Sequence, residues 1–422
     1  MEQVLYSLPD GWKWLTLSET TLNAKADIVD GPFGSNLKAS EYVNEGVPIL
    51  RLQNVDRLSF INKNIQFITK EKAEQLSRHS YKVGDIVITK LGAPLGKACI
   101  VPDDFEDGRI VADIVRARIN EDAFDKRYIC YAINSSACVR QLESQTKGAT
   151  RPRVNLSHMR GLILPVAPIS EQKRIVEKLD ALLTRIDTAI EYLQESVTLA
   201  DALYASELNE VFPSDADIES LTDKDGWVSL SDICTFENGD RGKNYPSKSA
   251  FVAEGIPVVS AGNLGERYID HKKLNYITPE RYDLLRSGRI KIGDILFCLR
   301  GSLGKVAISK DIKEGVIASS LVIIRPKDRV SAEYIYKYLK SSLCQKFISY
   351  YNNGAAQPNL SAKSLGKFML PLPNADQQKV IVDALDEKYQ LNQKLLDGLN
   401  SKIISLQSLK ASILDSAFKG EL

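Results

Sequence analysis

Two long stretches of the chain place apolar residues at alternating steps of three and four. The first, residues 171–212, contains neither Gly nor Pro, and its apolar positions are Ile175, Leu179, Leu182, Ile186, Ala189 or Ile190, Leu193, Val197, Ala200 and Tyr204. A 3.5-residue repeat keeps one seam of a helix facing a partner along its whole length. At 1.5 Å per residue this helix would be roughly 60 Å long.

The second stretch, residues 376–420, ends the chain with a seam of the same kind. Its members are Leu385, Tyr389, Asn392, Leu396, Leu399, Ile403, Leu406, Lys410, Ile413 and Ala417. Asn392 interrupts the apolar seam, which either sets the register of the pair or marks a locally exposed turn. We expect the two helices to pair antiparallel as a coiled coil.

Shorter patterns before each long helix predict a mixed α+β unit. The runs VPILRLQNV (47–55), DIVITK (85–90) and RIVADIVRARI (109–119) read as strands separated by Gly, Pro, Asn and Asp turns. Helices are expected after the caps Thr69 and Thr278, over 126–145 and over 332–350. LILP (162–165) and FMLP (368–371) read as a last strand before each long helix.

The two units are copies of one another. Gly11-Trp12 recurs as Gly226-Trp227, GVPILRLQNV (46–55) as GIPVVSAGNL (255–264), KVGDI as KIGDI, and the loop KGATRPRVNLS as NNGAAQPNLS. Such repetition over nearly the whole chain is the strongest structural signal in the sequence. The matched positions of Trp12, Trp14 and Trp227 favour core packing over base stacking.

We therefore predict two similar α+β domains in tandem, separated and held by an antiparallel pair of long helices, as a pseudo-two-fold internal repeat. The expected boundaries are 1–168 for the first domain, 169–212 for the central helix, 213–372 for the second domain and 373–422 for the C-terminal helix. A chain of 422 residues is long enough for more than one core.

Composition is that of an ordinary globular protein and excludes few partners. The net charge is +1, so any nucleic-acid face must be local. Six cysteines stand singly, which indicates buried, reduced thiols in a cytoplasmic protein, and three histidines show no metal-ligand spacing. No apolar run approaches a membrane span, and the N-terminus does not resemble a secretory signal.

No motif predicts catalysis. GAPLGKA (92–98) and GSLGKVA (301–307) lack the spacing of a phosphate-binding loop and the Ser or Thr that holds magnesium. Asp85 and Asp294 follow Gly in KVGDI and KIGDI, where they more simply begin a strand. We therefore predict no catalytic residue, no metal site and no cofactor on this chain.

If the chain binds DNA, the candidate contacts are cations and amides in glycine-rich loops, because phosphates bind positive side chains and base edges bind amides and guanidiniums. The candidates are Ser35, Asn36, Lys38, Arg51, Gln53, Asn54, Lys90, Lys97, Lys147, Arg151 and Arg153 in the first half, and Arg241, Lys243, Tyr245, Asn263, Arg300, Lys305, Asn352, Asn353 and Gln357 in the second. For any single cation the alternative is an ordinary solvated side chain.

Comparison of the copies divides the roles. Lys97 and Lys305 recur at matched positions, as expected of phosphate contacts. Positions that differ should discriminate unlike sequences. They are Arg51, Gln53, Arg151 and Arg153 in the first half and Arg241, Asn263 and Gln357 in the second.

The order of these motifs resembles the DNA-specificity subunit of type I restriction–modification systems. The resemblance rests on GPFGSNLKASEYVNEGVPILRLQNV (31–55), the paired Gly-Asp and Gly-Lys stretches, the GATRPRVNLS and GAAQPNLS loops, the EQK and DQQK helix starts, and the LKASILDSAFKGEL ending. It implies two target-recognition domains, each reading one half of a split double-stranded DNA site.

The resemblance also implies partners. Two modification methyltransferase subunits would dock on the paired helices and recruit restriction subunits, with S-adenosylmethionine, ATP and magnesium bound by those other subunits. We expect the outward face of the central helix, at Lys173, Glu177 and Arg185, to take part in docking. The alternative is a coiled-coil interaction scaffold without sequence-specific DNA binding.

Overall fold

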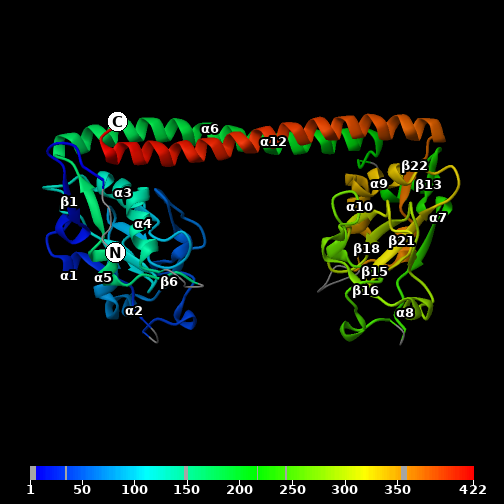
Figure 1. Ribbon diagram of the computed structural model, residues 1–422, viewed down its shortest axis with the longest axis horizontal. Helices are drawn as coiled ribbons and strands as arrows, with labels where there is room; N and C mark the ends of the chain where they lie inside the picture. The colour runs from blue at the N-terminus through cyan, green and yellow to red at the C-terminus, as the bar shows by residue number, and fades with distance from the viewer. Residues whose placement is uncertain (1–5, 34–35, 147–150, 216, 243–244, 353–358) are drawn as a thin grey trace. The chain divides into compact units, whose positions relative to one another are not determined.

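The computed structural model describes residues 6–33, 36–146, 151–215, 217–242, 245–352 and 359–422 (Figure 1). The chain divides into two units, Met1–Leu193 with Ser401–Leu422, and Gln194–Asn400. Helices α6 (Ile169–Val211) and α12 (Ala375–Lys419) are each continuous, as the heptad pattern predicts. Each unit therefore contains one end of both long helices.

Three sheets organise the first unit. Their strands are β1 (Lys13–Thr16), β2 (Ile28–Asp30), β3 (Val47–Leu50), β6 (Gln66–Ile68), β7 (Ser80–Tyr81), β8 (Ile86–Thr89), β9 (Ala98–Ile100), β10 (Gly108–Ile110), β11 (Ile114–Ala117) and β12 (Ile163–Val166). The strand orders are β6-β3-β10-β7, β2-β11-β8-β9 and β1-β12, and β4 (Val55–Asp56) with β5 (Ser59–Phe60) forms a separate hairpin. Among these strands β3 and β10 pair in parallel.

The second unit repeats the topology of these three sheets, and in place of the β4-β5 hairpin it has an isolated bridge between Leu264 and Ile269. Its strands are β13 (Trp227–Ser229), β14 (Cys234–Asn238), β15 (Ile256–Val259), β16 (Asn275–Ile277), β17 (Arg289–Ile290), β18 (Ile295–Cys298), β19 (Val306–Ile308), β20 (Gly315–Ile317), β21 (Leu321–Pro326) and β22 (Met369–Pro371). The orders are β16-β15-β20-β17, β14-β21-β18-β19 and β13-β22, with β15 and β20 parallel. The internal repeat and the α+β class are thereby confirmed.

Local capping explains the short helices. The side chain of Thr69 caps α2 (Lys70–Gln75) and that of Thr278 caps α8 (Pro279–Asp283), as predicted. The remaining short helices are α1 (Ala24–Asp27), α5 (Leu156–Arg160), α7 (Leu230–Ile233) and α11 (Ala362–Gly366).

One helix prediction was wrong in both copies. The expected single helices over 126–145 and 332–350 are each two helices, α3 (Lys126–Asn134) with α4 (Ser136–Ser144), and α9 (Ala332–Lys340) with α10 (Ser342–Tyr351). Ser135 and Ser341 separate them with extended backbones. Serine competes for backbone hydrogen bonds at such positions, and Ser341 caps α10 through its hydroxyl.

Each core is completed by an aromatic residue at the C-terminal end of a long helix. Phe418, near the end of α12, is buried in the first unit, 5.2 Å from the ring of Tyr128. Phe212, just after α6, is buried in the second, 5.2 Å from Tyr334. Each unit thus combines the start of one long helix with the end of the other. Figure 1 shows α3 and α4 next to this helix pair in the first unit.

The tryptophans pack as predicted. Trp12 lies against the first core with its ring 6.3 Å from that of Tyr128, and Trp227 lies against the second core. Trp14 is half-buried and contacts Tyr6 edge-on. These contacts place the three indoles in packing rather than at an exposed binding surface.

The helices pair antiparallel within each unit. In the first, Lys410 of α12 is ion-paired with Asp187 of α6 at 2.5 Å, and in the second Lys388 of α12 is ion-paired with Glu207 of α6. The predicted seam residues of both helices are buried or half-buried, and Asn392 is among the half-buried ones. The coiled-coil prediction is confirmed in both places.

A buried glutamine at the start of each long helix joins it to the domain. The Gln172 amide oxygen accepts from the Asp125 backbone N–H (2.9 Å), and its NH₂ donates to the Ala167 carbonyl (2.8 Å). Gln378 repeats this geometry with the Ser331 N–H (2.9 Å) and the Pro373 carbonyl (2.9 Å). Each amide thereby satisfies the N-cap of α3 or α9, which explains the recurrence of EQK and DQQK.

A carboxylate about two turns further along each long helix, Asp180 in one and Asp386 in the other, anchors the same short helix. Asp180 accepts from Arg127 and from the Tyr131 hydroxyl of α3. In the second unit Asp386 is paired with Lys337 of α9 (2.6 Å) and Arg267 (2.8 Å). Burial opposes the charged form of Asp386, but the two cations outweigh it and lower the pKa of its carboxyl.

All six cysteines are buried and free, as predicted. Burial raises the pKa of Cys99 and Cys138 to about 12, so these thiols are protonated at neutral pH. Within the described part of the chain, no helix has the length and apolar character needed to cross a membrane.

Replacing Gln172 by Ala should destabilise the protein by about 1–3 kcal/mol, because the Asp125 N–H and the Ala167 carbonyl lose their partner in a buried place. Urea denaturation of the full chain measures the change. Gln390→Ala, at an exposed position of α12, is the matched control and should change stability by less than about 0.5 kcal/mol. Equal effects of the two substitutions would contradict a stabilising role for the Gln172 hydrogen bonds.

Candidate nucleic-acid interface

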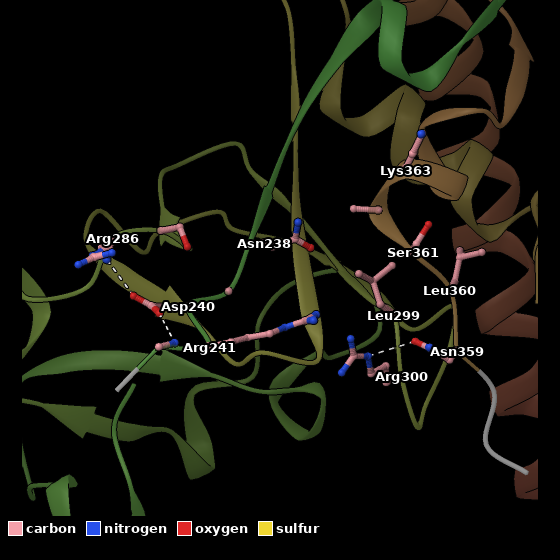
Figure 2. Close-up of a pocket in the computed structure, with 14 residues that line it drawn as sticks. Asn238, Asp240, Arg241, Arg286, Leu299, Arg300, Asn359, Leu360, Ser361 and Lys363 are labelled. Carbon is pink, nitrogen blue, oxygen red and sulfur yellow. Dashed lines mark hydrogen bonds between the residues drawn. The ribbon is translucent and has the colours of Figure 1, made fainter. Parts of the chain in front are cut away.

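Each unit has an open cavity bounded by loops that the sequence marked as candidate DNA contacts. The first, of about 580 Å³, is lined by Asp30, Phe33, Lys90, Arg153, Val154, Asn155, Leu156, Ser157 and His158. The second, of about 860 Å³, is lined by Asn238, Gly239, Asp240, Arg241, Gly242, Arg286, Ser287, Leu299, Arg300, Asn359, Leu360, Ser361, Ala362 and Lys363 (Figure 2). We call them the first pocket and the second pocket.

The two pockets occupy the same place in the repeated fold. The first pocket lies where β2 and β8 end, against the segment before α5. The second lies where β14 and β18 end, against the segment before α11. Isolated bridges join Leu91 to Arg153 in one unit and Arg300 to Asn359 in the other. The pockets are therefore equivalent in backbone and differ in side chains.

In each unit a glycine lets the loop after β2 or β14 pack closely against the neighbouring backbone. A Cβ on Gly31 would lie 2.1 Å from the carbonyl carbon of Val111, and one on Gly239 would lie 2.7 Å from the Ala318 oxygen. No larger residue fits at either position. The following residues, Phe33 in one loop and Arg241 in the other, consequently stand at the pocket.

The first pocket contains two fixed ion pairs. Lys90 is almost completely buried, and its Nζ lies 2.5 Å from the Asp30 carboxylate. Arg153 pairs with Asp113 at 2.6 Å, and its side chain is half exposed. The positive charges are thus neutralised in place, and Arg153 has the accessible guanidinium.

The second pocket is richer in accessible cations. Its lining includes the exposed cations Arg241, Arg300 and Lys363, and Lys363 lies apart from the two arginines in Figure 2. Arg300 Nε donates to the Asn359 side-chain oxygen at 3.1 Å. Hydrogen bonds from the Arg286 and Gly242 N–H groups lower the pKa of Asp240, which fixes the loop that carries Arg241.

Matched ion pairs support the strands beneath both pockets. Asp85 forms a two-pronged pair with Arg118 (2.8 and 2.8 Å), and Asp294 does the same with Arg325 (2.7 and 2.7 Å). The hydrogen bond to each carboxylate raises the pKa of the arginine. Both aspartates also close the turn before β8 or β18, which confirms their predicted part in starting a strand.

The predicted phosphate contacts Lys97 and Lys305 reach toward equivalent loops. Lys97 pairs with Asp56 at 2.9 Å, and Lys305 donates to the Ala261 carbonyl at 3.0 Å. Burial opposes the charge of Asp56, but Lys97 outweighs it and lowers the pKa of that carboxyl. Contact of either lysine with phosphate stays a prediction.

Three predicted DNA contacts are corrected by their burial. Lys90 is held by Asp30 inside the protein. The buried Asn54 amide accepts from the Arg51 N–H and donates to two carbonyls, and Asn263 accepts from the Ser260 N–H and donates to the Lys273 carbonyl. Reaching DNA would leave these partners unsatisfied, so the two asparagines close matched loops.

The other candidates are spread over both units. Exposed in the described part are Asn36, Lys38, Gln53, Arg151, Arg153, Arg241, Arg300, Lys305 and Asn352, while Arg51, Lys97 and Tyr245 are half-buried. Arg51 and Gln53 both donate to the Asn64 carbonyl. Outside the described residues lie Ser35, Lys147, Lys243, Asn353 and Gln357.

Sequence reasoning missed Phe33, Arg286 and Lys363 as pocket residues. Phe33 belongs to the GPFG motif and occupies the place of Arg241, but an aromatic side chain lacks the charge or amide group that predicts a DNA contact. Arg286 and Lys363 carried no local signal, because only the folded chain brings them to the same wall.

The family model described as "Type I restriction modification DNA specificity domain" matches residues 35–197 and 224–403. The chain is 22% identical over 325 residues to the type I restriction enzyme EcoBI specificity subunit of Escherichia coli, covering 73% of this chain and 68% of the relative. It is 22% identical over 436 residues to the EcoKI specificity subunit of Escherichia coli strain K12, covering 98% and 90%.

Solved structures share the fold. A chain described under "Structural basis underlying complex assembly and conformational transition of the type I R-M system" superposes with a TM-score of 0.75 at 21% identity, covering 99% of this chain and 100% of the other. The HsdS subunit from Thermoanaerobacter tengcongensis superposes with a TM-score of 0.52 at 22% identity, over all of both chains.

Lys90→Leu should destabilise the first unit by at least about 2 kcal/mol. The Asp30 carboxylate would lose its paired cation and would lie next to an apolar side chain instead. The second unit has Leu299 and Asn238 at these places. Adding Asp30→Asn should therefore restore most of the loss. Denaturation of the four members of this double-mutant cycle measures the coupling, and simple additivity would contradict a shared constraint.

Proposed function

The chain belongs to the type I restriction modification DNA specificity family, and on that premise we propose that each domain reads one half of a split double-stranded DNA site. The observation that carries the proposal is the pair of equivalent pockets. A shared backbone presents Phe33, Arg153 and Asp113 in one and Arg241, Arg300 and Asn359 in the other. Two domains with the same pocket backbone and different pocket side chains suit a DNA site whose two halves differ in sequence.

The pocket chemistry suits base edges and phosphates together. Arginine can donate two hydrogen bonds to guanine, and such a pair discriminates by about 1–3 kcal/mol. We assign base contacts to Arg151 and Arg153 in the first domain and to Arg241 and Arg300 in the second, all of which are exposed. Lys97, Lys305 and Lys363 are assigned to phosphates, which fix the register on the duplex.

In this function the chain contributes recognition and no chemistry. Specificity subunits are non-catalytic, and we assign S-adenosylmethionine, ATP and magnesium to the other subunits of the complex. Two methyltransferase subunits and, through them, restriction subunits are the proposed partners, in the cytoplasm. An interaction scaffold without DNA binding is not favoured, since it gives no reason for the matched cation-lined pockets.

An exposed leucine ridge on the helix pair supports protein docking. In the second unit Leu199 and Leu203 of α6 and Leu391 and Leu395 of α12 are 63%, 60%, 62% and 49% exposed. Leu203, Leu391 and Leu395 line a groove of about 400 Å³ together with Tyr204, Glu207, Lys388 and Asn392. Exposed apolar patches of this kind mark protein interfaces.

The predicted docking residues lie on the same helix in the first unit. Lys173, Glu177 and Arg185 are all exposed on α6. Their charges can select a partner orientation, while the leucines supply the apolar area. We therefore propose that methyltransferase subunits dock along α6 and α12.

Arg153→Ala should lower discrimination at one half of the DNA site by about tenfold and leave the other half unaffected, because one arginine reads one base pair. Arg241→Ala should do the reverse. Competition binding with duplexes changed in one half only measures both. Uniform weakening across all sequences would make these residues phosphate contacts, and salt-independent binding would contradict the function itself.

Leu203→Glu should weaken binding of the methyltransferase by more than tenfold, because it puts a charge into an apolar contact. Charge reversals at Lys173, Glu177 and Arg185 should weaken it less. Titration calorimetry with the purified partner measures the affinities, with Gln390→Ala as a surface control. Unchanged binding in all these variants would place the dock on the globular domains.

A further inference from the structure

A phenylalanine stands at the rim of the first pocket where the second pocket has an arginine. Phe33 is 54% exposed on the loop that follows β2. Arg241 follows β14 at the same distance beyond the close-packed glycine, Gly31 in one loop and Gly239 in the other. The two domains thus present unlike side chains from one backbone position.

The ring of Phe33 is held in place by two cations. Lys90 Nζ lies 4.4 Å from the ring centroid and Arg153 Cζ lies 5.9 Å from it. Both cations are themselves fixed, Lys90 by Asp30 and Arg153 by Asp113. Because its neighbours cannot move freely, the ring presents its remaining surface to solvent in a defined orientation.

A single exposed aromatic is common on protein surfaces and by itself indicates nothing. Phe33 differs because it borders a pocket whose accessible cation, Arg153, is a proposed base contact. In the major groove each base pair has its own pattern, and the 5-methyl group of thymine is the apolar feature that a phenylalanine can contact.

We infer that Phe33 reads a thymine of the first half-site through contact with its 5-methyl group. The inference rests on the proposed DNA function and adds a specificity residue of apolar character to it. Arg241, at the equivalent position, has no comparable apolar surface and reads a hydrogen-bonding edge in the second half-site.

Deoxyuridine tests this directly, because it removes only the methyl group from a thymine. The bound site is first found by selecting duplexes from a randomised pool with the full chain, and each thymine is then replaced by deoxyuridine in turn. The wild-type chain should lose roughly fourfold in affinity at one thymine, the factor expected for one buried methyl group. Phe33→Ala should bind both duplexes equally.

The matched control is Arg241→Ala, which should keep the fourfold methyl effect at that thymine. Phe33→Leu, which retains an apolar side chain, should keep part of it. Urea denaturation should give the same midpoint for Phe33→Ala and wild type, since more than half of the side chain is exposed.

The inference is overturned if the selected site contains no thymine, or if every methyl effect persists in Phe33→Ala. In either case sequence-selective binding by the wild type would still uphold the proposed function. If the wild type bound scrambled duplexes as tightly as the selected site, the proposed function would fail and this inference with it.

Discussion

Burial of one aromatic side chain from the far end of each long helix is the constraint on which both domains depend. Phe418 completes the core of the first unit and Phe212 that of the second. Losing a buried phenylalanine costs about 3–5 kcal/mol, so neither domain is independent of the helix that begins in the other. The glutamine clamps at Gln172 and Gln378 fix the opposite ends, because they satisfy the N-caps of α3 and α9.

This scaffold separates what is shared from what varies. The pairs Asp85–Arg118 and Asp294–Arg325 are the same in both units and hold the strands beneath the pockets. Lys90 with Asp30 and Leu299 with Asn238 are unlike solutions to one structural position. A recognition domain with constant ion pairs beneath its pocket and variable side chains around it can acquire a new target by substitution in its loops without loss of the fold.

Periodic features could be predicted from the sequence because many residues repeat the same information. The heptads specify α6 and α12, and the duplicated motifs specify two equal domains. The helix breaks at Ser135 and Ser341 were not predicted, because the apolar pattern continues through both serines. Only the structure shows that their backbones are extended and interrupt the helix.

The site was less predictable because a cation in the sequence does not reveal its partner. Lys90 looked like Arg153 in the sequence, yet Asp30, sixty residues away, draws it into the interior. Asn54 and Asn263 occupy matched positions in the two copies because each closes a loop by donating to backbone carbonyls. The sequence does not reveal these partners either. The two matched asparagines are thus structural, whereas the differing residues Phe33 and Arg241 lie at the pockets.

The measurement that tests the central claim most directly is selection of duplexes from a randomised pool by the full chain, followed by sequencing. Two pockets of one design predict two short specified segments separated by a gap in which every base is tolerated. A single uninterrupted motif, or no enrichment at all, would contradict the account.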